Sequence, residues 1–139
     1  MISRSQKETE KIAEVFISKL LKKEQKRSGA LVVGLSGNLG SGKTAFVKAA
    51  AKYFGIRDTV TSPTFVIMKK YRGFFFHLDA YRLKNEKELS VLGWRKIIGE
   101  KNNLVFIEWP ENVRKAMPRG ARYIFASYQK DGGRSFKLK

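Results

Sequence analysis

The chain has 139 residues, 42% of them hydrophobic, which is enough to bury the core of one globular domain without disulfides. It contains no cysteine, which excludes a disulfide framework, a thiolate nucleophile and a cysteine zinc site, and suits a reducing cytoplasm. Its 29 Lys and Arg against 12 Asp and Glu give a formal net charge of +17, which favours polyanionic partners or simply serves solubility.

The N-terminal half predicts two helices around a buried strand. Ser5 and Glu8 have the spacing of a capping box, and the apolar residues that follow recur at helical spacing. A continuous apolar run then predicts a strand buried on both faces of a sheet, and Gly55 ends a second helical pattern. We expect helices over residues 5–23 and 43–54, and the strand over residues 30–35.

The rest of the chain predicts further strands and short helices. Asn85 is a suitable cap for one of the helices, and Asp131-Gly132-Gly133 is a suitable hairpin turn. We expect strands over 64–71, 73–78 and 104–107, short helices over 85–92 and 110–117, and a terminal hairpin of 122–128 with 135–138.

This alternation predicts an α/β fold, with three α/β/α layers around a mainly parallel or mixed central sheet. We read residues 1–139 as one domain, because no linker, repeat or composition change divides them. No apolar stretch approaches the roughly 20 residues of a membrane span, and the N-terminus lacks signal-peptide character. We therefore expect a cytoplasmic protein with no membrane contact.

The segment 37–44 carries the strongest functional signal. Gly37, Gly42, Lys43 and Thr44 meet the pattern G-x-x-x-x-G-K-[ST]. Glycines let successive backbone N–H groups face phosphate oxygens, and the following helix adds its positive N-terminal end. Lys43 would then reach the β- and γ-phosphates and Thr44 would ligate Mg²⁺. A glycine-rich turn without a ligand is the alternative, but the flanking strand and helix favour nucleotide binding.

Two carboxylates are candidates for the acidic group that a P-loop needs. Asp79 and Glu108 each follow an apolar strand, at the edge where doubly wound sheets bind ligands. Either would hold the metal or polarise water, and the sequence does not rank them. The alternative for each is a surface carboxylate or a helix cap.

Four segments resemble the TsaE family, the ATPases of the bacterial machinery that makes threonylcarbamoyladenosine on tRNA. They occur in the family's order and approximate spacing, and the pair Glu8-Thr9 resembles the acidic-threonine pair that opens the family's first helix. The four segments are Gly37–Thr44, Thr61–Phe65, His77–Arg82 and Ile107–Pro110. The resemblance implies ATP or ADP bound with Mg²⁺, and hydrolysis that is slow or that requires the partner proteins TsaB and TsaD.

The resemblance also implies a role for each matching residue. Thr44 and Glu108 would hold Mg²⁺, and Asp79 would be a second acid near the metal or the attacking water. Together with Lys43 these acids would form the catalytic group, and Thr9 would lie near the adenine. The phosphates would be cradled by Gly37, Asn38, Leu39, Gly40, Ser41, Gly42, Lys43 and Thr44.

For the other residues in these segments, the sequence allows both a functional and a structural interpretation. Thr61–Phe65 resembles a switch-like segment, and a Ser-Pro turn is its plain alternative. His77, the only histidine, is more often a hydrogen-bonded structural residue than a base. Trp109 either borders the nucleotide or packs in the core, and packing is preferred. Arg82 would touch phosphate, partner or RNA, or lie on the surface, and Ala45 departs from the threonine that the family often has.

No arginine finger is evident in the sequence, so we expect weak hydrolysis by the chain alone and stimulation by partners or tRNA. The net charge exceeds what the family leads us to expect, which favours direct tRNA contact or an acidic partner. Two other functions stay open. One is a small P-loop kinase, although no lid segment is evident, and the other is a basic RNA-binding module that uses ATP as a switch.

Overall fold

The computed structural model describes residues 1–24, 26–57 and 67–139, which form a seven-stranded sheet with helices on both faces. In chain order the elements are β1 (Ile2–Ser3), α1 (Gln6–Lys23), β2 (Leu31–Ser36), α2 (Lys43–Tyr53), β3 (Met68–Tyr71), β4 (Phe75–Asp79), α3 (Lys87–Ser90), α4 (Trp94–Gly99), β5 (Leu104–Glu108), the 3₁₀ helix η1 (Pro110–Ala116), β6 (Arg122–Tyr128) and β7 (Arg134–Leu138).

The strand order is β1-β7-β6-β2-β5-β4-β3. The four central strands β6, β2, β5 and β4 run parallel, and β3, β7 and β1 add antiparallel edges. The prediction of a mainly parallel or mixed sheet is therefore confirmed in its mixed form. β2 lies between β5 and β6, so the loop that follows β2 leaves from the middle of the sheet.

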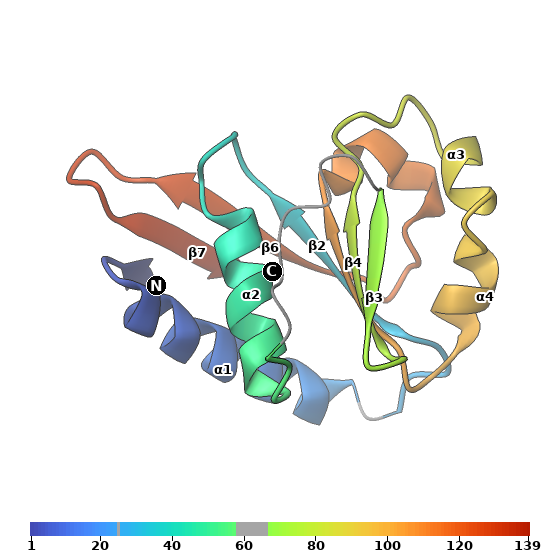
Figure 1. Ribbon diagram of the computed structural model, residues 1–139, viewed down its shortest axis with the longest axis horizontal. Coiled ribbons are helices and arrows are strands. Elements are labelled where there is room, and N and C mark those ends of the chain that lie inside the picture. Colours follow the sequence, from blue (N-terminus) through green and yellow to red (C-terminus); the bar gives the residue numbers. More distant parts are fainter. Residues whose placement is uncertain (25, 58–66) are drawn as a thin grey trace.

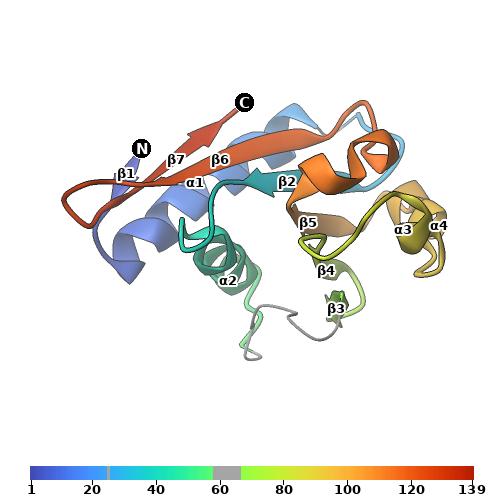
Figure 2. The same ribbon diagram turned by 90° about the horizontal axis from the view of Figure 1, so that it is seen from above.

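Alternate residues of the central strands build two separate cores, as strands buried on both faces require. Val33 and Phe106 face the core that α1 and α2 cover, which also includes Phe46. Val32 and Val105 face the opposite core, covered by α3, α4 and η1. Figure 1 and Figure 2 show α1 and α2 side by side, with the sheet between them and the pair α3–α4. This arrangement confirms the three layers.

The start of α1 confirms only half of the expected capping box. Ser5 is the N-cap, and its hydroxyl accepts the Glu8 N–H at 3.1 Å. The Glu8 carboxylate, however, accepts from the backbone N–H of Arg4 and not from that of Ser5. The cap therefore links the helix to Arg4, directly after β1, a short strand that the sequence pattern did not predict.

The third and fourth helices differ from the prediction. Instead of opening a helix over 85–92, Asn85 accepts the Lys87 N–H at 3.0 Å in a turn, and α3 begins only at Lys87. The helix α4 was not predicted, because a segment of six residues is too short to show helical periodicity. It begins after Gly93, whose φ of 77° breaks the preceding turn.

The remaining predicted elements are confirmed with shifted ends. The second helix ends at Tyr53, before Gly55, and the helix predicted over 110–117 is the 3₁₀ helix η1. The strand predicted over 73–78 is β4, and the terminal hairpin is β6 with β7. Of the strand predicted over 64–71, Met68–Tyr71 form β3, Ile67 precedes that strand, and residues 64–66 lie outside the described residues. Within the described ranges, no helix is both long enough and apolar enough to cross a bilayer.

Candidate functional site

The loop between β2 and α2 owes its shape to glycines at positive φ. Gly37 has φ of 147°, Gly40 of 79° and Gly42 of 108°. A Cβ on Gly37 would lie 2.2 Å from the carbonyl oxygen of Ala126 in β6, so a side chain there overlaps the backbone of the neighbouring strand. The glycines that the motif predicts are therefore needed for the fold of this loop as well as for any ligand.

We expect Gly37→Ala to lower the free energy of unfolding by about 1–3 kcal/mol, because alanine is strained at this φ and its methyl group meets the Ala126 carbonyl. Gly120→Ala is the matched control, since a Cβ there meets no atom within 4 Å. Chemical denaturation of both variants measures the difference. Equal stability of the two variants would contradict this account of the loop.

Lys43 is a buried cation at the first residue of α2. Its Nζ donates to the carbonyl oxygens of Gly37 and Asn38, and lies 4.4 Å from the centre of the Trp109 ring. Burial lowers the pKa of Lys43, and nearby carboxylates, Glu108 first among them, act in the opposite direction. The loop thus holds a partly desolvated positive charge beside its own backbone.

Thr44 and Glu108 are in contact, as the predicted metal site requires. The Thr44 hydroxyl lies 3.1 and 3.2 Å from the two carboxylate oxygens of Glu108. His77 Nε2 lies 2.6 Å from Glu108 Oε2, and both side chains are buried. His77 is therefore a hydrogen-bonded residue behind the carboxylate, in agreement with the structural role preferred from the sequence.

Asp79 lies beside Glu108, because the two residues are register partners at the ends of β4 and β5. Its Oδ1 accepts the Tyr81 N–H at 2.9 Å. Within the described ranges, no three His, Cys, Asp or Glu side chains are grouped as a metal site. A metal held here would therefore take only one or two carboxylates from the protein, as Mg²⁺ commonly does when phosphates complete its ligands.

These groups line a hollow of about 860 Å³, called here the larger hollow. It includes Lys43, Thr44, Asp79 and Glu108, so the structure brings together all the predicted catalytic and metal residues. Trp109 also lines it, while its side chain packs against the core beneath α3 and α4. This packing agrees with the interpretation preferred from the sequence, and the alternative, that Trp109 borders the nucleotide, stays a prediction. Further lining comes from Leu39, Gly40, Gly42, Ala45, Ile67, Tyr81, Arg82, Leu83, Glu88, Val91, Leu92 and Arg134.

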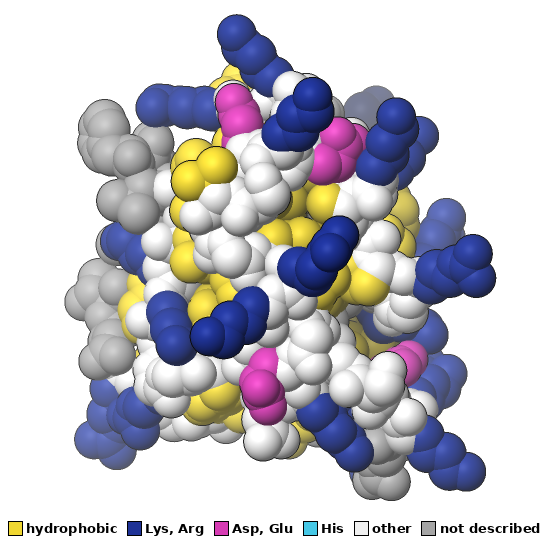
Figure 3. Space-filling view, turned by 90° about the vertical axis from the view of Figure 1, so that its right-hand side faces the viewer, with side chains coloured by type: hydrophobic (Ala, Val, Ile, Leu, Met, Phe, Trp, Pro, Cys, Tyr) yellow, Lys and Arg dark blue, Asp and Glu magenta, His cyan; other side chains and the backbone are white. Residues whose placement is uncertain are grey.

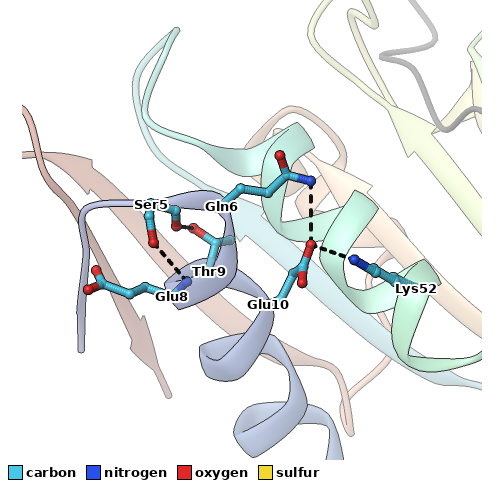
Figure 4. A network of polar contacts seen from close by, with 6 residues as sticks. All are labelled: Ser5, Gln6, Glu8, Thr9, Glu10 and Lys52. Carbon is cyan, nitrogen blue, oxygen red and sulfur yellow. Dashed lines mark hydrogen bonds and ion pairs between the residues drawn. The ribbon is translucent and has the colours of Figure 1, made fainter.

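A second hollow of about 530 Å³, the smaller hollow, lies where the starts of α1 and α2 meet the terminal hairpin. Thr9 lines it, but the Thr9 hydroxyl is 2.7 Å from Ser3 Oγ and donates to the Ser5 carbonyl. Figure 4 shows this cap, with Glu10 reaching Lys52 of α2 at 3.0 Å beside it. Thr9 is thus near the loop, and its hydroxyl is held by the cap.

Sequence reasoning missed one residue of this region, Arg134. It lines both hollows, together with Thr44 and Ala45. No motif marks Arg134, and the strand predicted over 135–138 begins one residue after it; the observed β7 includes Arg134 and places it on the same face as Phe136. The switch-like segment Thr61–Phe65 lies outside the described residues.

Comparison with known proteins identifies the family. The family model "Threonylcarbamoyl adenosine biosynthesis protein TsaE" matches residues 3–136. The tRNA threonylcarbamoyladenosine biosynthesis protein TsaE of Treponema pallidum is 33% identical over 139 residues, which are 99% of this chain and 97% of that protein. The Rickettsia conorii protein of the same name is 35% identical over 114 residues, 79% of this chain, and the match spans only 60% of that protein's length.

The fold has a solved counterpart as well. The crystal structure of Bacillus subtilis YdiB matches with a TM-score of 0.73 at 23% identity, covering 99% of this chain and 82% of that one. At that identity the likeness supports the α/β fold alone. The family model and the curated relatives also identify the family, and they confirm the resemblance noted from the four sequence segments. The chain belongs to the TsaE family of tRNA threonylcarbamoyladenosine biosynthesis proteins.

Proposed function

We propose that this chain is a single Mg²⁺-dependent ATPase domain that binds and hydrolyses ATP in the threonylcarbamoyladenosine pathway. One observation carries the proposal. The glycine-rich loop, the buried Lys43 and the Thr44–Glu108 contact lie together at the carboxyl ends of parallel strands. That is where open α/β sheets bind phosphorylated ligands.

The residues present fit a polyphosphate. The Ser41 hydroxyl is buried and has no hydrogen-bond partner among the described residues, so an anion oxygen in the loop would satisfy it. The N-terminus of α2 directs its free backbone N–H groups into the same loop. Lys43 Nζ would exchange two neutral carbonyls for phosphate oxygens, which are stronger acceptors for a cation.

The same site fits Mg²⁺ through oxygen ligands. When bound, the ion neutralises phosphate charge and acts as a Lewis acid. Thr44 and Glu108 would hold it, since their oxygens are already adjacent, and the hydrogen bond from His77 fixes the orientation of the carboxylate. Asp79, one strand away, would orient the attacking water or a metal-bound one.

The base would enter the smaller hollow. This hollow adjoins the larger one at Thr44 and Ala45, so a nucleotide with its phosphates in the loop can extend into it. Thr9 would then shape the wall near the adenine through the capped turn that holds it, while its hydroxyl stays with Ser3 and Ser5.

We also propose that TsaB-like and TsaD-like proteins activate hydrolysis. The support is membership of the family, together with three apolar side chains exposed on the rim of the larger hollow. These are Leu39, Tyr81 and Val91, the last of them 87% exposed. Exposed apolar side chains beside a binding site are typical of a surface that a partner covers.

The net charge of +17 supports a tRNA contact in addition. Figure 3 views the molecule from the side of α3 and α4, where Lys and Arg side chains project in all directions and Asp and Glu are few. Basic side chains spread in this way attract a polyanion without reading its sequence.

The test is ATP turnover by the chain alone and with TsaB-like and TsaD-like proteins, with and without tRNA. We expect weak turnover by the chain alone and stimulation of about tenfold or more by the partners. The reason is that no sequence motif of this chain supplies an arginine finger to the γ-phosphate. Equal turnover in all mixtures would contradict activation. Phosphate transfer from ATP to a sugar or nucleoside would instead indicate a kinase.

A further inference from the structure

Arg134 is directed toward the phosphate loop by the pairing of β7. This strand lies between β1 and β6, and Arg134 is the register partner of Ser3 on one side and of Tyr128 on the other. Phe136, two residues along and on the same face, is fully buried 5.4 Å from the ring of Phe46 in α2. Because Phe136 is anchored against α2, Arg134 projects over the beginning of that helix.

The side chain of Arg134 rests against Gly42. A Cβ built on Gly42 would lie 2.8 Å from Arg134 Cδ and 3.5 Å from its Nε. Of the described residues, only Thr44, Ala45 and Arg134 line both hollows. The guanidinium therefore lies where the two hollows meet.

The charge of Arg134 is half-buried and has no partner within the described ranges. No hydrogen bond or ion pair there includes its guanidinium, whereas Arg4 pairs with Asp131 at 2.8 Å and Arg122 with Glu24 at 3.5 Å. A partly desolvated guanidinium gains most from an anion with several oxygens, because its planar donors bind two of them at once. The loop beneath it is the phosphate site proposed above.

We propose that Arg134 is a phosphate-binding residue, donating hydrogen bonds to the polyphosphate chain of the nucleotide where that chain passes between the two hollows. This inference rests on the proposed function. Arg134, which belongs to the terminal hairpin, thereby adds a positive charge to the phosphate site that no sequence motif marks. It also explains why position 42 needs glycine beyond its φ, since a side chain there would displace the arginine.

The test compares Arg134→Gln with Lys137→Gln, which removes the same charge from an exposed position on the opposite face of β7. Isothermal titration calorimetry measures Mg-ATP, Mg-ADP and inorganic tripolyphosphate with Mg²⁺. We expect Arg134→Gln to weaken all three by about 10- to 100-fold, as the loss of charge-assisted hydrogen bonds predicts. Lys137→Gln should bind as the wild type does. Arg134→Lys should fall between the two, because it keeps the charge without the planar donors.

Thermal unfolding of each variant checks the fold. If Arg134→Gln does not fold, the ligand affinities of Arg134→Lys and the wild type are compared instead to test the role of Arg134. Affinities equal to the wild type would overturn the assignment of Arg134 while leaving the proposed function intact. A loss for ATP with unchanged tripolyphosphate binding would overturn it too, since Arg134 would then contact the base or ribose. Failure of the wild type itself to bind any of the three ligands would reject the proposed function and this inference together.

Discussion

Lys43→Met is expected to weaken Mg-ATP binding by about 100-fold, the effect of losing two charge-assisted hydrogen bonds to phosphate. The fold should survive, because methionine keeps an aliphatic stem against Trp109 and removes a charge whose burial is costly. Lys19→Met, at an exposed position of α1, is the control for the change in net charge. Calorimetry and thermal unfolding measure the two effects.

The lowered pKa of Lys43 fixes the sign of its pH dependence. In the folded protein this amine loses its proton at a lower pH than in the unfolded chain, so between the two pKa values the unfolded chain binds more protons. Stability therefore rises with pH in that window, while ATP affinity falls as the amine becomes neutral. Full ATP affinity up to the pH at which an ordinary lysine titrates would contradict the role of Lys43.

Glu108→Gln is expected to reduce Mg²⁺-dependent ATP turnover by about 100-fold, since it removes the charged ligand of a metal worth several kcal/mol to the reaction. The amide keeps the shape of the side chain and can still pair with Thr44 and His77. Binding of ATP without Mg²⁺ should change little. The variant therefore separates loss of metal binding from loss of the fold.

Two comparisons make the result for Glu108 specific. Glu100→Gln, at an exposed site after α4, should leave turnover unchanged. Asp79→Asn tests the second acid, and we expect it to lower turnover while preserving the affinity for Mg-ATP, because Glu108 contacts the Thr44 hydroxyl in the structure. The reverse pattern, with affinity lost in Asp79→Asn and kept in Glu108→Gln, would exchange the two roles.

Local patterns predicted the parts of the site that depend on local structure. The loop 37–44 needs glycines at fixed spacing between a strand and a helix, and Asp79 and Glu108 follow apolar runs. Since parallel strands end at one edge of the sheet, the two acids meet there as register partners.

What the sequence did not predict depends on contacts between distant segments. Arg134 reaches the loop only because β7 pairs between β1 and β6, and no local signal sets that register. The positive φ of Trp109 directly after β5 is likewise marked by no sequence pattern. The turn at Asn85 and the short helix α4 are set by packing against the core, which overrides weak local preferences.

The most direct measurement is a calorimetric titration of the folded chain with ATP in the presence and absence of Mg²⁺. The account predicts saturable binding at one site per chain that strengthens with Mg²⁺ and is largely lost in Lys43→Met. Absence of any Mg²⁺-dependent heat from ATP or ADP, with a chain shown to be folded, would contradict it.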